Sequence, residues 1–159
     1  MNRLNFISGG GEMGQLIREK DWENHPLGNP RDWPQSLKTT LSIILNSKFP
    51  KFLFWGEDLR CFYNDAYRPS LGIEGMHPNI LGEKGEVAWE EIWDLIKPMM
   101  DGVIATGEAT WSENQLIPFY RNGKVEEMYW TFSYSPIIDE HGKIAGIFTS
   151  VVETTKEVL

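Results

Sequence analysis

The sequence predicts a single α+β domain in which a five-stranded antiparallel sheet carries helices on one face and a helical cap precedes the sheet. Three observations lead to this prediction. Two short apolar strand patterns lie in residues 50–63, three longer ones lie in residues 109–152, and the clearest amphipathic helix of the chain separates the two groups. Further helical patterns occur before residue 49, so we expect an extension in front of the sheet.

The composition is typical of one ordinary domain and argues against several classes of partner. The chain has 159 residues, of which 41% are hydrophobic, and its formal net charge is -8. An acidic chain without a basic stripe repels a phosphate backbone, so we expect no nucleic-acid partner. The single cysteine, Cys61, forms no internal disulfide, and no apolar run approaches the roughly 20 residues that span a bilayer. We expect a cytoplasmic location and no membrane attachment in this segment.

The first 49 residues predict an amphipathic helical extension. Met13, Leu16 and Ile17 have helical spacing, and the stretch of residues 21–33, rich in Pro and Gly, contains apolar side chains that predict a packed connection. Asp32 is expected to cap the next helix. The apolar positions of that helix recur on one face and are Leu37, Leu41, Ile44 and Leu45.

A hairpin is expected next, at residues 52–63. Residues 52–55 read FLFW and are apolar at every position, so both faces of this strand must be covered. Turn residues at 56–58 lead into a second strand at 59–63. Asn64 then caps a brief helix.

The second half of the chain predicts one long helix followed by three strands. The helix covers residues 89–107, where apolar side chains keep helical spacing and Gly107 ends the pattern. The strands are expected at three segments, residues 109–118, 125–136 and 144–152. Asn122 and Gly123 supply the turn between the first two strands, and residues 153–159 begin another helix.

Several of these segments resemble the PAS family. Residues 133–146 read SYSPIIDEHGKIAG and are similar to the family's last hairpin, in which a strand with Ser and Pro enters an Asp-x-x-Gly turn. Residues 63–67, YNDAY, resemble its Asn-x-Ala-aromatic helix start, and Leu81-Gly82 resembles the pair before its long helix. The resemblance implies three parts: an N-terminal helical cap at 1–49, a PAS core at 50–153 and the start of a C-terminal signalling helix at 154–159.

The front of the chain resembles one subgroup of that family. Residues 22–28 read WENHPLG, residues 33–37 read WPQSL and residues 47–50 read SKFP. These runs are similar to the N-terminal cap of PAS domains at the start of bacterial sensor histidine kinases, including the hybrid kinases.

The resemblance also implies a pocket between the sheet and the long helix. Trp130, Phe132 and Tyr134 alternate along one strand and share a face, which by the resemblance points toward the helices. The side chains expected around the same hypothetical ligand pocket are Trp55, Ile96, Leu116 and Thr149. The alternative is that these bulky side chains fill the space completely. Trp111 is out of phase with Leu116 unless a bulge intervenes, and it is the candidate for an interface.

The end of the last strand is the expected signal relay. The family commonly ends this strand with Asp, an aliphatic residue and Thr, whereas Glu153, Thr154 and Thr155 stand at this place in the chain. The resemblance implies that the longer Glu153 side chain still anchors the outgoing helix.

The known cofactor motifs of the family are not matched. Flavin-binding relatives that form a photoadduct carry Asn-Cys-Arg in the connecting region, where residues 79–82 read NILG, and haem-binding relatives use a His on or near the long helix, which has none at 89–107. Cys61 is expected to be a small core residue, and His77 a solvated side chain. Adjacent carboxylates such as Glu90 and Glu91 diverge in direction and form no acid–base pair.

Three functions follow from these observations. The expected one is a non-catalytic sensory domain that binds a small ligand, forms a homodimer, or both, and relays the signal to further sensor modules or a two-component histidine kinase in the same polypeptide. The alternative is a ligand-free dimerisation and relay module. The third is a small enzyme on a cone-like α+β fold, which would need a carboxylate or a Tyr/His pair where the expected inward face is apolar and aromatic.

Overall fold

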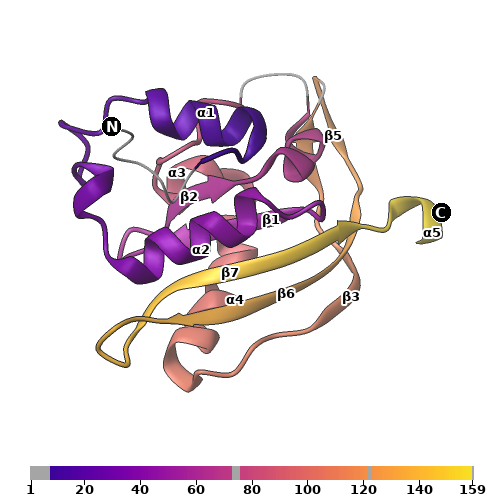
Figure 1. Ribbon diagram of the computed structural model, residues 1–159. Coiled ribbons are helices and arrows are strands. Elements are labelled where there is room, and N and C mark those ends of the chain that lie inside the picture. The colour runs from indigo at the N-terminus through magenta and orange to yellow at the C-terminus, as the bar shows by residue number, and fades with distance from the viewer. Residues whose placement is uncertain (1–7, 73–75, 122, 159) are drawn as a thin grey trace.

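The computed structural model describes residues 8–72, 76–121 and 123–158, which form a sheet with helices at both of its faces (Figure 1). The helices, including the short 3-10 helices η2–η4, are α1 (Gly11–Glu19), η2 (Pro30–Asp32), α2 (Gln35–Leu45), η3 (Asp65–Leu71), α3 (Gly85–Ala88), η4 (Glu90–Ile92), α4 (Trp93–Thr106) and α5 (Thr155–Val158). The strands are β1 (Lys51–Trp55), β2 (Arg60–Tyr63), β3 (Ser112–Leu116), β4 (Phe119–Arg121), β5 (Lys124–Glu126), β6 (Tyr129–Ile138) and β7 (Ile144–Glu153).

Five strands form one antiparallel sheet in the order β2-β1-β7-β6-β3, with β7 at its centre. The pairing of β6 with β7 is the longest and runs from Trp130 opposite Glu153 to Ile138 opposite Ile144. β4 and β5 form a separate two-stranded hairpin. The architecture confirms the predicted α+β class and its five-stranded antiparallel sheet.

Strand β1 is buried on both faces, as its uninterrupted apolar run predicts. Phe52 and Phe54 point to the face that α4 covers, which we call the inner face. Leu53 lies opposite Phe62 of β2 on the other face, and both side chains are fully buried. Neighbouring residues of a strand point to opposite faces, so both layers of cover contact this one strand.

The N-terminal segment covers the outer face at the β1–β2 end of the sheet, where α1 and α2 lie (Figure 1). The Phe62 ring stacks on Trp22 with a centroid distance of 5.8 Å and meets Trp33 edge-on at 5.7 Å. The predicted helical cap thus covers the outer face, while α4 lies over the inner face. Helices cover both faces at this end because β1 and β2 are apolar on both sides.

A buried asparagine joins the cap to the sheet by hydrogen bonds. The amide nitrogen of Asn64 donates to three backbone carbonyls, those of Ile44 (2.9 Å), Ser47 (3.3 Å) and Phe49 (2.9 Å). Its amide oxygen accepts from the backbone N–H groups of Lys51 and Tyr67, both at 3.1 Å. The bond to Tyr67 confirms that Asn64 caps a short helix, η3, and the other bonds fix the end of α2 against the start of β1.

The next residue, Asp65, caps a helix that lies far away in the sequence. Its carboxylate accepts from the backbone N–H groups of Glu12 (3.0 Å) and Met13 (2.9 Å) at the start of α1. A negative charge at this end of a helix is favourable because the unpaired N–H groups carry partial positive charge. Asp65, at the start of η3 just after β2, therefore supplies the N-terminal cap of α1.

The imidazole of His25 links the α1–α2 connection to the loop before α3 by hydrogen bonds. Nδ1 of His25 accepts from the Leu27 N–H at 3.0 Å, so Nε2 carries the proton and donates to the Gly82 carbonyl at 2.8 Å. Burial is the main cause that lowers the pKa of His25, and the bond to Gly82 opposes it. Gly82 has φ +78, and a Cβ there would lie 3.1 Å from the Trp22 ring, so glycine permits this close approach.

Several element boundaries differ from those that the sequence predicts. α2 begins at Gln35 after Pro34, so Asp32, expected as its cap, lies in η2 instead. The helix expected at 89–107 is interrupted: η4 precedes α4, which begins at Trp93. Gly107 ends α4 in the left-handed region with φ 74, as predicted.

The strand expected at 125–136 is also divided. β5 ends at Glu126 and belongs to the separate hairpin, and β6 begins at Tyr129. The predicted turn residue Asn122 lies outside the described residues, and its neighbour Gly123 has φ +83.

Candidate ligand cavity

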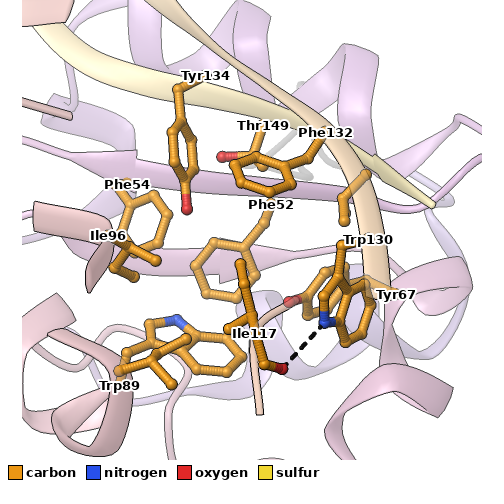
Figure 2. A pocket seen from close by; sticks show the side chains of 12 residues that line it. Phe52, Phe54, Tyr67, Trp89, Ile96, Ile117, Trp130, Phe132, Tyr134 and Thr149 are labelled. Atoms are coloured by element: carbon orange, nitrogen blue, oxygen red, sulfur yellow. Dashed lines mark hydrogen bonds between the residues drawn. The ribbon is translucent and has the colours of Figure 1, made fainter. Parts of the chain in front are cut away.

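A small cavity of about 50 Å³ lies between the inner face of the sheet and the helices (Figure 2). Its sheet side consists of Phe52, Phe54, Trp130, Phe132, Tyr134, Thr149 and Val151. Its other side consists of Tyr67, Trp89, Ile92, Ile96 and Ile117. The cavity therefore joins residues from both halves of the chain.

Strand pairing aligns the cavity residues of three neighbouring strands. Thr149 on β7 lies opposite Tyr134 on β6 and opposite Phe52 on β1. Val151, two residues further along β7, lies opposite Phe132. Residues that pair directly across an antiparallel sheet share a face, so all five side chains point into the same space.

Aromatic contacts form most of the cavity wall. The Phe52 ring lies 4.7 Å from Phe54, 5.0 Å from Tyr67 and 5.6 Å from Trp89, measured between ring centroids. Rings packed at these distances stabilise one another in tilted and edge-on arrangements. The wall is thus a connected aromatic cluster, and the volume left inside is small compared with the roughly 300–1,000 Å³ of typical ligand pockets.

Three lining residues carry a hydroxyl group, namely Tyr67, Tyr134 and Thr149. Figure 2 shows the Tyr134 hydroxyl directed into the cavity, and Thr149 lies opposite Tyr134 on the neighbouring strand. Thr149 is 6% exposed, and its Oγ1 has no hydrogen-bond partner among the described residues. Burial raises the pKa of Tyr134 well above its ordinary value, so this hydroxyl is neutral at physiological pH.

The lining contains no ionisable residue other than tyrosine. No carboxylate, ammonium, guanidinium or imidazole is among the twelve lining side chains. The indole N–H of Trp130 makes a long bond of 3.4 Å to the Ile117 carbonyl. The polar groups that face a guest molecule are therefore neutral.

Five of the seven side chains predicted to surround a ligand line this cavity. They are Ile96, Trp130, Phe132, Tyr134 and Thr149. Whether they bind a ligand stays a prediction.

The predicted placement of Trp55 is wrong. Trp55 follows Phe54, which lines the cavity, so alternation turns the Trp55 side chain away from it. Trp55 is buried at the end of the sheet and lines a separate groove with Leu59 and Ile144. Because residues 52–55 are all apolar, no alternation of apolar and polar residues indicates which of them point inward.

The predicted placement of Leu116 is also wrong, and a bulge is the reason. Ser112 pairs with Phe132 and Gln115 with Trp130, so β3 contains one more residue than β6 over this interval. Leu116 consequently pairs with Tyr129, points outward and is 38% exposed, while Ile117 lines the cavity.

The sequence prediction missed seven lining residues. They are Phe52, Phe54, Tyr67, Trp89, Ile92, Ile117 and Val151. Val151 could have been found, because it lies two residues from Thr149 and shares its face. The others depend on strand register and on loop packing, which local periodicity does not specify.

The predicted relay residues lie where β7 passes into α5. The Thr154 N–H donates to the Tyr129 carbonyl at 2.7 Å, and the Tyr129 N–H donates to Oγ1 of Thr155 at 3.1 Å. Glu153 is exposed and lies opposite Trp130 in the ladder. The start of α5 is thus attached to β6 one residue before the cavity residue Trp130.

Cys61, His77 and the adjacent carboxylates Glu90 and Glu91 lie outside the cavity lining. Cys61 is fully buried, and burial raises the pKa of its thiol. His77, expected to be solvated, instead lies with Nδ1 2.7 Å from the Tyr63 hydroxyl, and burial lowers the pKa of His77. Glu90 and Glu91 are exposed.

No cluster of three metal-ligating side chains occurs among the described residues. None of the helices in the described ranges has the length and apolarity that crossing a bilayer requires.

Comparison with known proteins finds similarity in structure only. No protein-family model and no curated protein matches the sequence. The PAS domain of BvgS from Bordetella pertussis is 18% identical, covers 75% of this chain and 86% of its own length, and superposes with a TM-score of 0.57. A sensory box sensor histidine kinase from Vibrio cholerae is 16% identical over 75% of this chain and 90% of its own, with a TM-score of 0.50.

A third similar structure is an RNA-binding light-oxygen-voltage receptor. It is 18% identical over 71% of this chain, with a TM-score of 0.54. This chain spans only 31% of the length of that receptor. Identities this low establish a common fold and leave ligand, partners and output open.

Proposed function

We propose that this chain, which has the PAS fold of those structures, is a non-catalytic sensory module that binds a small molecule and relays the bound state to an output module in the same polypeptide. The observation that carries the proposal is that one strand runs from the cavity wall into the C-terminal helix. Strands β6 and β7 wall the cavity, and β7 continues directly through Glu153 into α5.

The relay path is short. Trp130 and Val151 line the cavity, and each lies within a few residues of the hydrogen bonds that connect Tyr129 with Thr154 and Thr155. A guest that displaces either side chain would alter these bonds, and with them the position of α5. Such coupling requires only that the guest favours one of two arrangements.

The output that we propose is a two-component histidine kinase. The similar structure from Vibrio cholerae, a sensor histidine kinase, supports this context. Another similar structure is an RNA-binding receptor. The net charge of -8 argues against nucleic-acid contact by the present domain itself.

The neutral lining supports binding rather than catalysis. General acid–base chemistry requires a titratable group within hydrogen-bond reach of the reacting atoms. The lining of the cavity offers only hydroxyl and indole groups, and the Tyr134 hydroxyl, whose pKa burial raises, is a weak acid. The enzyme alternative therefore has the least support.

A permanently filled cavity should mimic the bound state. In Val151→Phe the larger ring occupies the cavity, and we expect amide hydrogen exchange in residues 153–158 to change by about fivefold or more, the usual lower bound for coupled sites. Exchange measured by mass spectrometry checks this expectation. If the added ring destabilises the fold, Ile96→Phe introduces a similar ring from α4.

The matched control is Val152→Phe. Val152 follows Val151 in β7, points to the outer face and is 50% exposed. It places the same ring equally near α5 but outside the cavity, so exchange should stay at the wild-type level. Equal exchange in all variants would contradict the relay proposal.

Homodimerisation is a second candidate function, and the uncovered part of the outer sheet face favours it. The side chains that we call the outer strip are Trp111, Leu116, Tyr129 and Phe148. Trp111 is 70% exposed and Leu116 is 38% exposed, and both lie on the outer face because of the bulge in β3. The four side chains of the strip are uncharged, so their contact with a second copy would bury apolar surface.

Trp111→Glu should weaken self-association by at least about 30-fold, because it replaces an exposed indole at the proposed interface by a charge. Sedimentation velocity over a concentration series measures this change. Val87→Glu, at an exposed position of α3, is the control and should self-associate like the wild type. A wild-type protein that stays monomeric throughout the series would rule out this candidate.

A further inference from the structure

We infer that the cavity selects a small, uncharged molecule of about three to five non-hydrogen atoms that carries one carbonyl or hydroxyl oxygen. This inference rests on the proposed ligand-binding function and names the chemical class of the ligand. It follows from three properties of the cavity: its volume, the absence of charge among its twelve lining residues, and the hydroxyl groups of Tyr134 and Thr149.

The volume sets the size of the guest. A water molecule needs about 10–15 Å³ of such free volume, so 50 Å³ accommodates a guest equivalent to a few waters. An engineered apolar cavity of about 150 Å³ holds benzene. A planar cofactor such as flavin or haem is far larger than either, and its entry would require the aromatic wall around Phe52 to separate.

The lining excludes charge. A buried ion needs an opposite charge or several hydrogen bonds to replace its hydration. The twelve lining residues offer no counter-ion, and the walls are chiefly rings and aliphatic groups. A carboxylate, phosphate or ammonium would therefore lose its hydration without replacement.

The hydroxyl pair specifies an oxygen atom on the guest. Tyr134 and Thr149 lie directly opposite each other in the β6–β7 ladder, and both line the cavity. Oγ1 of Thr149 is buried and has no hydrogen-bond partner among the described residues. Because this hydroxyl makes no hydrogen bond within the described protein, it is available to bond a carbonyl or hydroxyl oxygen of the guest.

Four probes test size and charge separately. 2-Butanone is neutral and small, propionate and butylammonium have the same number of non-hydrogen atoms but carry opposite charges, and 2-octanone is neutral but longer. Methyl NMR signals of Ile96, Thr149 and Val151 report binding at the cavity. We expect 2-butanone to bind in the micromolar to millimolar range, the affinity open to so few atoms. The ions should bind at least about 100-fold more weakly.

Thr149→Val tests the hydroxyl, because valine has nearly the shape of threonine and lacks the oxygen. We expect it to weaken binding of 2-butanone about tenfold. Thr131→Val is the matched control: Thr131 lies on β6 between two cavity residues but points to the other face, where its hydroxyl accepts from the Asn114 N–H. It should leave the affinity unchanged.

The outcomes separate the two proposals. Tighter binding of propionate, butylammonium or 2-octanone than of 2-butanone would overturn the inferred ligand class and leave the sensory function standing. Unchanged affinity in Thr149→Val would overturn the role of its hydroxyl. Absence of methyl shifts with every probe would overturn ligand binding by this cavity, and with it the proposed function.

Discussion

Replacing Asn64 by alanine should destabilise the fold by about 5 kcal/mol, since five hydrogen bonds of a fully buried side chain are lost and each contributes about 1 kcal/mol. The loss affects the end of α2, the start of β1 and the cap of η3 together. Alanine leaves three carbonyls and two N–H groups without this partner, and unsatisfied buried groups account for much of the cost. Equilibrium unfolding in urea measures the change.

Asn46→Ala is the control for Asn64→Ala. Asn46 also donates from its side-chain amide to a backbone carbonyl, that of Ser42 at 2.8 Å, but it is exposed to solvent. Water can replace that bond, so we expect a change within about 0.5 kcal/mol. Similar destabilisation by both substitutions would mean that Asn64 does not organise the junction between cap and sheet.

Phe62→Ala should cost about 3–5 kcal/mol, the usual range for truncating a buried phenylalanine. Its ring lies in contact with Trp22 and Trp33 of the cap and opposite Leu53 of the sheet. Because these contacts join the cap and the sheet in one hydrophobic core, the whole chain should still unfold in a single transition, at lower temperature. Calorimetry measures both the midpoint and the number of transitions.

Phe49→Ala is the matched control, because the Phe49 side chain is 69% exposed. It should change stability by less than about 0.5 kcal/mol. Two separate transitions, with only one shifted by Phe62→Ala, would show that residues 1–49 and 50–153 fold as independent units. The predicted boundary at residue 50 would then be a domain boundary; a single transition would make the cap part of the same cooperative domain.

The success of the cavity prediction varies from strand to strand, and the reasons are physical. On β6 a regular alternation of large apolar and small polar residues puts Trp130, Phe132 and Tyr134 on one face, the PAS resemblance turns that face toward the helices, and all three line the cavity. On β1 no alternation exists, because both faces are covered, and the predicted residue Trp55 lies one position away from Phe54. On β3 the bulge reverses the phase before Leu116.

In the N-terminal cap, too, the sequence predicts which segment is packed but not which distant residues bond to it. The Trp-rich connection is expected to be packed, and Trp22 and Trp33 are indeed buried. The bond from His25 to Gly82 and the capping of α1 by Asp65 join residues more than 50 positions apart. No local pattern predicts such pairs, since they exist only after the chain has folded.

The α+β class, the order of the main elements, the helix end at Gly107 and the inward face of β6 can all be read from the amino-acid sequence. These features depend on residue type and short-range periodicity, which backbone geometry converts directly into helices, strands and faces. The register of β3, the size of the cavity and the pairing of Tyr134 with Thr149 became known only from the folded chain. Each of these depends on how distant segments pack, and packing volume and strand register are not encoded in any one segment.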